Sequence, residues 1–214
     1  IPTPPTGRPR SCCEVGSWDG KWLSNTHTLL AECGWSGLLL EADSARSAQA
    51  ADMYRAMGKL RERGDDKSQG VVCVSALVAF KDDDMDLSAR TTTSAQAQES
   101  LPVSATLTSL FDTLNADYPG LVPPDLDLLS IDIDGNDLHV WQALLLQGRY
   151  RPVVVVIEFN PTIPNDVDFR QVPDMAVQQG SSLRALAEGL AFANGYCLVC
   201  TTTYNAFFVR AESM

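Results

Sequence analysis

Residues 126–137, LDLLSIDIDGND, decide how the rest of the chain can be arranged. The first half of this stretch is apolar, and the second half carries three acids around one glycine: Asp132, Asp134, Gly135 and Asp137. An ionised carboxylate removed from water without a partner costs several kcal/mol, so these acids are not expected inside a buried strand. We therefore expect a central strand of an open α/β sheet that delivers its acids to the edge where such sheets bind ligands.

Length and charge limit what the chain can be. Its 214 residues suit a single α/β domain, which we expect over residues 12–214 after an extended, proline-rich lead-in over residues 1–11. The net charge is -11 and no basic cluster is present, which argues against nucleic acid as a partner. The longest apolar runs are far shorter than the ~20 residues of a membrane helix, so a soluble protein is expected.

Strand and helix patterns alternate along the chain, as in a parallel α/β sheet. Further strands are predicted at residues 12–15, 37–41, 71–80 and 151–160, with a closing hairpin at residues 196–201 and 205–210. Helices are predicted at residues 22–33, 44–63, 106–115, 138–147 and 181–194. Four strands end in an acid, namely Glu14, Glu41, Asp132 or Asp134, and Glu158. The carboxyl ends of parallel strands meet at one edge, so the pattern predicts a shared acidic site.

The first predicted strand runs into a glycine turn, EVGSWDG at residues 14–20. Gly16 and Gly20 would let the backbone approach a ligand at the start of a helix. Glu41 follows about 20 residues later, the interval at which dinucleotide-type folds place an acid for ribose hydroxyls. Alternatively, Glu41 and Asp43 cap the next helix, and both roles are compatible.

Two long polar segments are predicted to be loops. Residues 81–100 lack apolar periodicity, and residues 161–180 contain three prolines and can cover the acidic edge. The six cysteines lie mostly in apolar runs and are expected to pack as free thiols. Cys197 and Cys200 form a CxxC, but on a strand they would point to opposite faces. The DxDGxD run does not fit a calcium loop, because its glycine falls early and a strand precedes it, so no metal is expected.

Six segments resemble, in order and spacing, the FkbM-type class I methyltransferases that use S-adenosylmethionine. They are CCEVGSWDGKWLSNT, GWSGLLLEAD, LDLLSIDIDGND, RPVVVVIEFNPTIP, SLRALAEGLAFANGYCLVC and NAFFVR. The resemblance covers residues 12–210, and its most specific parts are IDIDGND and VVVIEFNPTIP. It implies a Rossmann-like, doubly wound, mostly parallel sheet of seven strands, with a C-terminal antiparallel hairpin and helices on both faces.

The resemblance also implies roles for individual residues. The cofactor-binding residues would be Glu14, Gly16, Asp19, Gly20 and Glu41. The catalytic residues would be Asp132, Asp134, Glu158 and Asn160. Asp132 would face the sulfonium end of S-adenosylmethionine, and the other three would border the acceptor. Carboxylates favour a cationic cofactor, and an acid near the acceptor can take up a hydroxyl proton.

The implied activity is methyl transfer from S-adenosylmethionine, most simply to a hydroxyl of a small-molecule or sugar-like acceptor. Neither His27 nor His139 is favoured as the base, because a histidine in a helix is more often packed or exposed than catalytic.

Two departures from the family pattern leave a second function open. Trp18 stands where the middle glycine of the turn is usual, and residues 1–10 stand where family members carry a segment that helps close the site. The alternative is a catalytically degenerate methyltransferase-like domain that serves as a structural or interaction subunit of a larger assembly, with proteins as its partners. The chain begins at Ile1 without a methionine, so an upstream segment is expected, and a targeting segment is one candidate for it. The compartment stays open between the cytoplasm and an organelle reached with such a segment.

Overall fold

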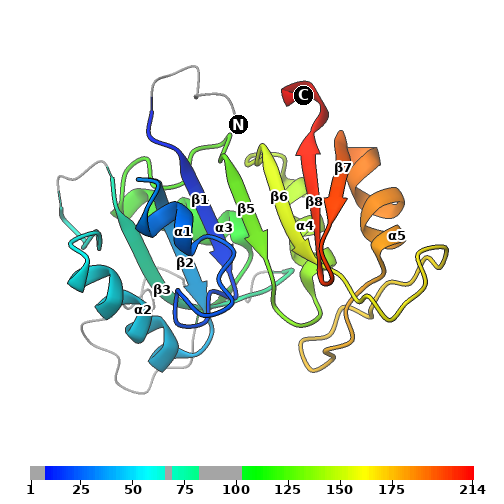
Figure 1. Cartoon of the computed structure of the whole chain (residues 1–214), viewed down its shortest axis with the longest axis horizontal. Helices are drawn as coiled ribbons and strands as arrows, with labels where there is room; N and C mark the ends of the chain where they lie inside the picture. The colour runs from blue at the N-terminus through cyan, green and yellow to red at the C-terminus, as the bar shows by residue number, and fades with distance from the viewer. Residues whose placement is uncertain (1–7, 66–68, 82–102) are drawn as a thin grey trace.

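A single sheet organises the computed structural model, which describes residues 8–65, 69–81 and 103–214. Within these residues the sheet has eight strands in the order β4-β3-β2-β1-β5-β6-β8-β7 (Figure 1). They are β1 (Ser11–Val15), β2 (Ser36–Glu41), β3 (Val71–Val78), β4 (Val103–Ala105), β5 (Leu128–Ile131), β6 (Val154–Glu158), β7 (Tyr196–Thr201) and β8 (Asn205–Arg210). Only β8 is antiparallel to its neighbours, β6 and β7. The predicted fold class is confirmed, and the short β4 adds a strand to the seven expected.

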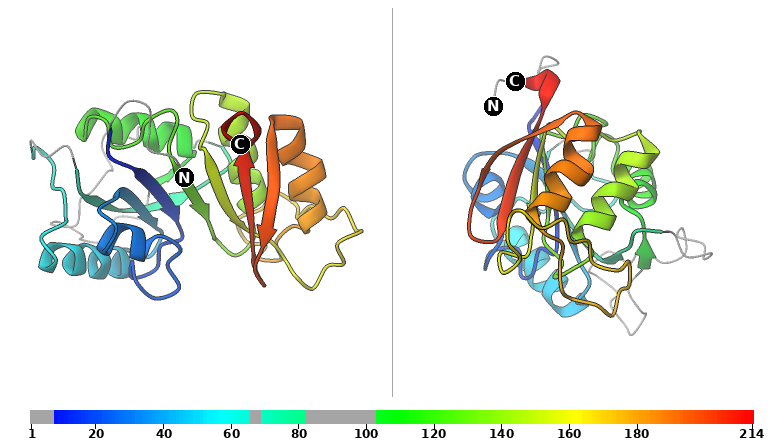
Figure 2. Two further views of the ribbon diagram at one scale, coloured as in Figure 1. Left: turned by 45° about the horizontal axis from the view of Figure 1, so that its top comes forward. Right: turned by 90° about the vertical axis from the view of Figure 1, so that its right-hand side faces the viewer.

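Helices cover both faces of the sheet. They are α1 (His27–Ala31), α2 (Ser44–Ala56), α3 (Leu107–Asp117), α4 (Asp137–Gln147) and α5 (Leu183–Leu186), the last continued by a π-helical turn (Ala187–Ala191) and a 3-10 turn (Phe192–Asn194). A further 3-10 turn (Ala211–Ser213) follows β8. One face packs against α1 and α2, and the other against α3, α4 and α5 (Figure 2). In the described part of the chain, no helix has the length and apolar character needed to cross a bilayer.

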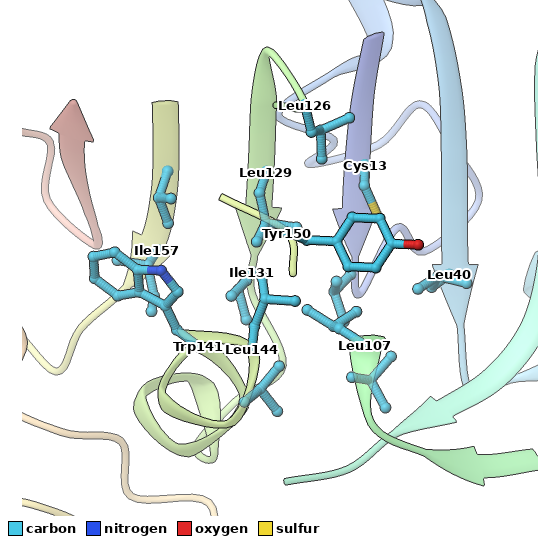
Figure 3. Packing of buried hydrophobic residues seen from close by; sticks show 14 of the residues in the cluster. Cys13, Leu40, Leu107, Leu126, Leu129, Ile131, Trp141, Leu144, Tyr150 and Ile157 are labelled. Carbon is cyan, nitrogen blue, oxygen red and sulfur yellow. The ribbon is translucent and has the colours of Figure 1, made fainter. Parts of the chain in front are cut away.

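The larger core lies between the sheet and the second group of helices. Leu129 and Ile131 of β5 and Ile157 of β6 point toward Trp141 and Leu144 of α4 (Figure 3). All five side chains are buried. Each such side chain contributes about 1.5–3 kcal/mol by leaving water, so this packing fixes the strands whose ends form the acidic edge.

Local signals set several helix ends where the sequence predicts them. Asp43 accepts hydrogen bonds from the backbone N–H groups of Ala45 and Arg46 and so caps α2. The hydroxyl of Thr106 caps α3, and Gly148, with a φ of 67°, ends α4. These positions confirm the predicted starts and stops, because each residue satisfies the backbone groups that a helix terminus leaves unpaired.

Two predicted helices are shorter in the structure. The helix predicted over residues 22–33 forms only at His27–Ala31, because residues 24–26 hydrogen-bond to Glu14 instead of to a helical backbone. The helix predicted over residues 44–63 ends at Ala56. Gly58 has a φ of 67°, and the following segment pairs with the start of β3 through Leu60 and Val71. Tertiary contacts override local propensity in both cases.

The edge strand β7 corrects the expectation for the CxxC cysteines. A bulge between Leu198 and Cys200 shifts the register, so that Cys197 pairs with Val209 and Cys200 with Phe207. Val209 and Phe207 lie two residues apart on β8, so both cysteines belong to the same face of the sheet. All six cysteines are free, but only Cys12, Cys13 and Cys73 are buried. Cys33 and Cys200 are exposed, against the expectation of packed thiols.

The structure describes one of the two predicted loops in full and almost nothing of the other. Residues 161–180 contain no helix or strand, as expected. The other predicted loop, residues 81–100, lies almost wholly outside the described residues, as does most of the predicted lead-in over residues 1–11.

Candidate active site at the carboxyl edge of the sheet

Three acids lie at one level of the sheet, at its lower edge in Figure 1. Leu40, Val15, Ile131 and Ile157 pair with one another across β2, β1, β5 and β6. The next residue along each of these strands is Glu41, Gly16, Asp132 and Glu158, respectively. Because side chains at one level of neighbouring parallel strands share a face, the three carboxylates begin on the same side of the sheet. Segments far apart in the sequence therefore meet at one edge beside the glycine turn.

Gly16 brings the turn after β1 against the end of β5. Its φ is 81°, and its N–H donates to the carbonyl oxygen of Leu40 at 2.9 Å. A Cβ atom at this position would lie 1.8 Å from the backbone oxygen of Asp132. No other residue fits here without moving one of the two strands, because the clash involves backbone. The sequence predicts that this glycine lets the backbone approach a ligand, and the structure shows that it lets the turn approach the backbone at the end of β5.

Glu14 lies beneath the turn and is 1% exposed. Its carboxylate accepts hydrogen bonds from the Ser24 hydroxyl and the Thr26 hydroxyl, both at 2.6 Å, and from the Asn25 N–H at 2.5 Å. Burial raises the pKa of Glu14, the three hydrogen bonds oppose this, and the nearby Asp132 raises it further. Both oxygens thus hold the segment that follows the turn, and the structure places this predicted cofactor residue inside the protein.

Asp19 and Gly20 shape the rest of the turn. Asp19 accepts hydrogen bonds from the backbone N–H groups of Lys21 and Trp22. Gly20 has a φ of 75°, and a Cβ atom on it would lie 2.9 Å from the Cβ of Ala50 in α2. The turn is therefore fixed both by its own hydrogen bonds and by contact with α2.

Glu41 joins the turn to the start of α2. Its Oε2 accepts from the N–H of Trp18 at 2.8 Å, and its Oε1 accepts from the N–H of Asp43 at 2.9 Å. The Trp18 ring stacks with the Arg46 guanidinium, whose centre lies 3.0 Å from the ring centroid, and remains 43% exposed. Glu41 and Asp43 thus organise the helix start together, as the capping alternative predicts.

Beside the glycine turn and Glu41, the site contains a group of four acids: Asp132, Asp134, Asp137 and Glu158. Burial raises the pKa of Glu158 to about 8, and the charges of the other three acids add to this, against a hydrogen bond from the Asp134 N–H. Burial also raises the pKa of Asp137 to about 7, although the N–H groups of Ile133 and Gly135 donate to it. The pKa of Asp132 is raised by burial and by Asp134, while a hydrogen bond with Asn205 opposes the shift.

Asp134 differs from its neighbours because its side chain is exposed and its φ is 56°. A positive φ is uncommon outside glycine, although aspartate is among the residues that tolerate it. In this conformation the N–H of Asp134 reaches the Glu158 carboxylate. The strained turn thus links the end of β5 to the end of β6.

A pocket of about 230 Å³ lies beside these acids. Its wall includes Asp134, Glu158, Asn160, Thr162, Gln179 and Tyr204. The loop at residues 161–180 forms part of this wall, as the sequence predicts for a segment that can cover the edge. In the described part of the chain, no group of three or more histidine, cysteine, aspartate or glutamate side chains has an arrangement that could hold a metal ion.

Asn160 ties this loop to the sheet. Its side-chain N–H donates to the carbonyl oxygen of Gln179 at 2.8 Å, and its amide oxygen accepts from the N–H and the hydroxyl of Thr162. The structure therefore brings Asp132, Asp134, Glu158 and Asn160 together at one end of the edge. Glu41 and the glycine turn lie on the other side of Asp132, across β1.

Sequence reasoning missed Tyr204 and Asn205 of the β7–β8 hairpin, as well as Gln171. The hairpin residues could have been predicted from the sequence. Because β8 runs antiparallel to β6, it begins at the edge where β6 ends, and this places Asn205 opposite Glu158. Gln171 could not be predicted in this way. Its buried side chain donates to the Val177 carbonyl oxygen and accepts from the N–H groups of Gln179 and Gly180.

Both histidines hold loops through one ring nitrogen. The Nδ1 of His27 lies 3.0 Å from the carbonyl oxygen of Gly20 in the glycine turn. The Nε2 of His139 donates to the carbonyl oxygen of Gln171 at 2.7 Å, since a carbonyl oxygen can only accept. Neither nitrogen is directed at the acid group.

The fold is that of an α/β protein with acids and a pocket at the carboxyl ends of its parallel strands. The family described as "Methyltransferase FkbM domain" matches residues 14–183. This match spans most of the chain, so the protein belongs to the FkbM methyltransferase family. No curated protein matches the sequence.

Several solved structures are similar at low identity. The mitomycin 7-O-methyltransferase MmcR has 14% identity and a TM-score of 0.41, over 95% of this chain and 49% of its own. The O-methyltransferase TomG from Streptomyces achromogenes, involved in tomaymycin synthesis and solved with SAM, has 18% identity and a TM-score of 0.41, over 93% and 71%. A structure titled "Conversion of a Disulfide Bond into a Thioacetal Group during Echinomycin Biosynthesis" has 15% identity and a TM-score of 0.44, over 97% and 78%. The chain spans about half the length of MmcR.

Proposed function

We propose that the protein is an S-adenosylmethionine-dependent methyltransferase that acts on a hydroxyl of a small-molecule or sugar-like acceptor. Family membership supplies the reaction class. The observation that carries the proposal is the common level of Glu41, Gly16, Asp132 and Glu158 along the edge of the sheet. In this proposal, Glu41 and Gly16 belong to the cofactor half of the site, which binds S-adenosylmethionine. Glu158 belongs to the acceptor half, and Asp132 lies between the two halves.

The residues of the turn fit the proposed cofactor. The backbone at Gly16 leaves no room for a side chain, and the buried hydroxyl of Ser17 has no hydrogen-bond partner among the described residues. S-adenosylmethionine, when bound, supplies an electrophilic methyl group on a positively charged sulfur. We assign the ribose hydroxyls to Glu41, which is only partly buried, and the attraction of the cationic sulfur to Asp132.

Glu14 and Asp19 act on the cofactor through the turn in this proposal. Their oxygens accept hydrogen bonds from residues 21–26, so they fix the backbone that would surround the ligand. Both are therefore positioning residues of the cofactor half.

The acceptor half supplies a proton acceptor. Glu158 lines the pocket, and its pKa of about 8 suits a group that takes a hydroxyl proton near neutral pH. Asn160 and Asp134 border the same pocket and would orient the acceptor. Fixing the acceptor oxygen close to the reacting carbon supplies much of the acceleration in a displacement of this kind.

Isothermal titration calorimetry with S-adenosylmethionine tests the proposal. We expect micromolar binding by the wild-type chain, and weakening by about 10- to 100-fold in Glu41→Gln and Asp132→Asn, the range set by loss of a charged hydrogen-bond partner. Glu32→Gln is the matched control, because Glu32 is exposed and follows α1, before the amino end of β2. Absence of binding by a folded wild-type chain would reject the enzyme and leave the interaction subunit as the alternative.

A further inference from the structure

The polar side chains that line the pocket beside Glu158 are acids, amides, one threonine and one tyrosine, represented by Asp134, Glu158, Gln179 and Tyr204. Phe159, Pro161 and two glycines complete the lining. Among the described residues that line it, none is a lysine, arginine or histidine. The lining therefore combines negative charge, hydrogen-bonding amides and an aromatic side chain that is 58% exposed.

The size of the pocket limits what can occupy it. Its volume of about 230 Å³ lies below the range of about 300–1,000 Å³ that holds drug-sized ligands. A single six-membered ring with its substituents is a suitable occupant. Tyr204 can pack against the C–H face of such a ring while the amides and acids bind its hydroxyl groups.

Two backbone N–H groups beside this pocket are not free to bind an anionic ligand. The N–H groups of Ile133 and Gly135, at the turn into α4, already donate to the buried carboxylate of Asp137. Two arginines of the covering loop and of α5 are paired with acids, Arg170 with Asp168 and Arg184 with Glu188. A phosphate or carboxylate would therefore meet the Asp134 carboxylate without a guanidinium or ammonium group from the lining to offset its charge.

We propose that this pocket is a subsite for one polyhydroxylated ring that is uncharged or carries an ammonium group, and that it rejects rings bearing phosphate or carboxylate. The proposal rests on the proposed function, because it names the acceptor class of that same site. Asp134, whose side chain is exposed at the pocket, sets the charge preference, and Tyr204 supplies affinity for the ring itself.

A series of probes that share one sugar ring and differ at C6 tests the charge preference without any turnover. The probes are methyl α-D-glucoside, its 6-amino-6-deoxy analogue and its 6-phosphate, titrated at pH 7 into the labelled full chain and followed by NMR shifts of Gln179 and Tyr204. We expect the amino probe to bind at least about tenfold more tightly than the phosphate probe, with the neutral probe between them. Equal or tighter binding of the phosphate probe would overturn the proposal. So would the absence of shifts at these residues with all three probes at about 50 mM, the scale of a very weak complex.

Substitutions separate charge from shape. Asp134→Asn should reduce the ratio of amino-probe to phosphate-probe affinity by about fivefold or more, whereas Tyr204→Ala should weaken all three probes alike. Glu188→Gln, an exposed acid paired with Arg184 outside the pocket, is the control and should leave the ratio unchanged. An unchanged ratio in folded Asp134→Asn would assign the selectivity elsewhere and refute the role given to this acid.

The calorimetry with S-adenosylmethionine distinguishes failure of this proposal from failure of the proposed function. Cofactor binding combined with tight phosphate-probe binding would reject only the acceptor class. Loss of cofactor binding combined with the expected probe order would reject the methyltransferase and retain the ring subsite.

Discussion

Glu14 and Glu158 show how environment separates two glutamates on β1 and β6, two strands with β5 between them. Glu14 is enclosed and its oxygens accept three hydrogen bonds, so it works as an anchor for the turn. Glu158 is only partly buried and lies among three other acids, which disfavour its ionised form. Hydrogen bonds to a carboxylate stabilise its charge, while nearby carboxylates oppose it. Glu158, with a pKa of about 8, is therefore suited to exchange a proton near neutral pH.

We expect Glu158 to titrate near pH 8 in the folded protein. A carbon-13 NMR titration of glutamate carboxyl groups should show one resonance with that pKa, and the resonance should be absent in Glu158→Gln. If Glu158 accepts the acceptor proton, turnover should rise as the pH passes through about 8, because the ionised form is the base. Glu158→Gln should remove that rise and lower kcat by about 10²- to 10⁴-fold.

Asp134→Asn is the companion variant for this titration. It removes one of the charges that raise the Glu158 pKa, so the Glu158 midpoint should move to lower pH. Glu188→Gln should not move it. A Glu158 midpoint near its ordinary value of 4.5 in the wild-type chain would contradict the assignment.

Asp137 links the same site to stability. Its pKa rises from an ordinary 3.8 to about 7 on folding, so between these values the folded state binds more protons than the unfolded state. The free energy of unfolding should therefore be highest below about pH 4 for this group. It should fall as the pH rises to about 7, by at most about 4 kcal/mol. Urea unfolding at several pH values should give a flatter profile in Asp137→Asn, and an equally steep profile would contradict this account.

At the scale of elements, one side chain holds the loop that covers the site. Gln171 is 1% exposed, and its amide makes three hydrogen bonds to residues 177–180 of its own loop. It also lies against Gly135, where a Cβ atom would come within 3.0 Å of its amide oxygen. The loop is thus joined both to itself and to the turn after β5.

Gln171→Ala should loosen this loop without unfolding the domain. It leaves backbone groups at Gln179 and Gly180 unpaired, at a cost of about 1–3 kcal/mol for each buried group. Amide hydrogen exchange at these two residues should accelerate by about 10- to 100-fold, while exchange in β5 should not change. Gln147→Ala, at an exposed position at the end of α4, is the control. Unchanged exchange at Gln179 and Gly180 would show that other contacts hold the loop.

The elements also show what sequence could predict and why the rest was missed. Strand ends at Glu41, Asp132 and Glu158 were predictable, because apolar runs that stop at an acid mark both burial and its end. The short α1 was not predictable from its own residues, because residues 24–26 donate hydrogen bonds to the Glu14 carboxylate of β1. The shared face of Cys197 and Cys200 depends on a bulge that their spacing does not reveal. Local patterns located the elements, and long-range contacts set their limits.

At the scale of the whole molecule, Trp141 joins three elements into one core. Its side chain is fully buried, with ring centroids 5.4 Å from Tyr196 of β7 and 5.2 Å from Phe208 of β8. The antiparallel end of the sheet is thereby packed against α4, whose first turn carries Asp137. The folding of this hairpin and the geometry of the site are therefore coupled through α4.

Trp141→Ala should lower the free energy of unfolding by about 3–5 kcal/mol, the usual cost of removing a large buried aromatic side chain. Trp141→Phe should cost less, because a ring remains and the indole N–H has no partner among the described residues. Denaturant unfolding followed by circular dichroism measures both. Equal losses in the two variants would show that the position depends on the indole shape and not on buried volume.

The bulge in β7 has a consequence for the behaviour of the protein at high concentration. This strand is the last in the sheet order, and Val199 at its bulge is 55% exposed. A straight outer strand with free main-chain groups is a template on which further copies can polymerise. The extra residue breaks the regular spacing of those groups and bends the strand, so another chain cannot extend the ladder in register. The bulge thus makes β7 a poorer template for pairing with another chain.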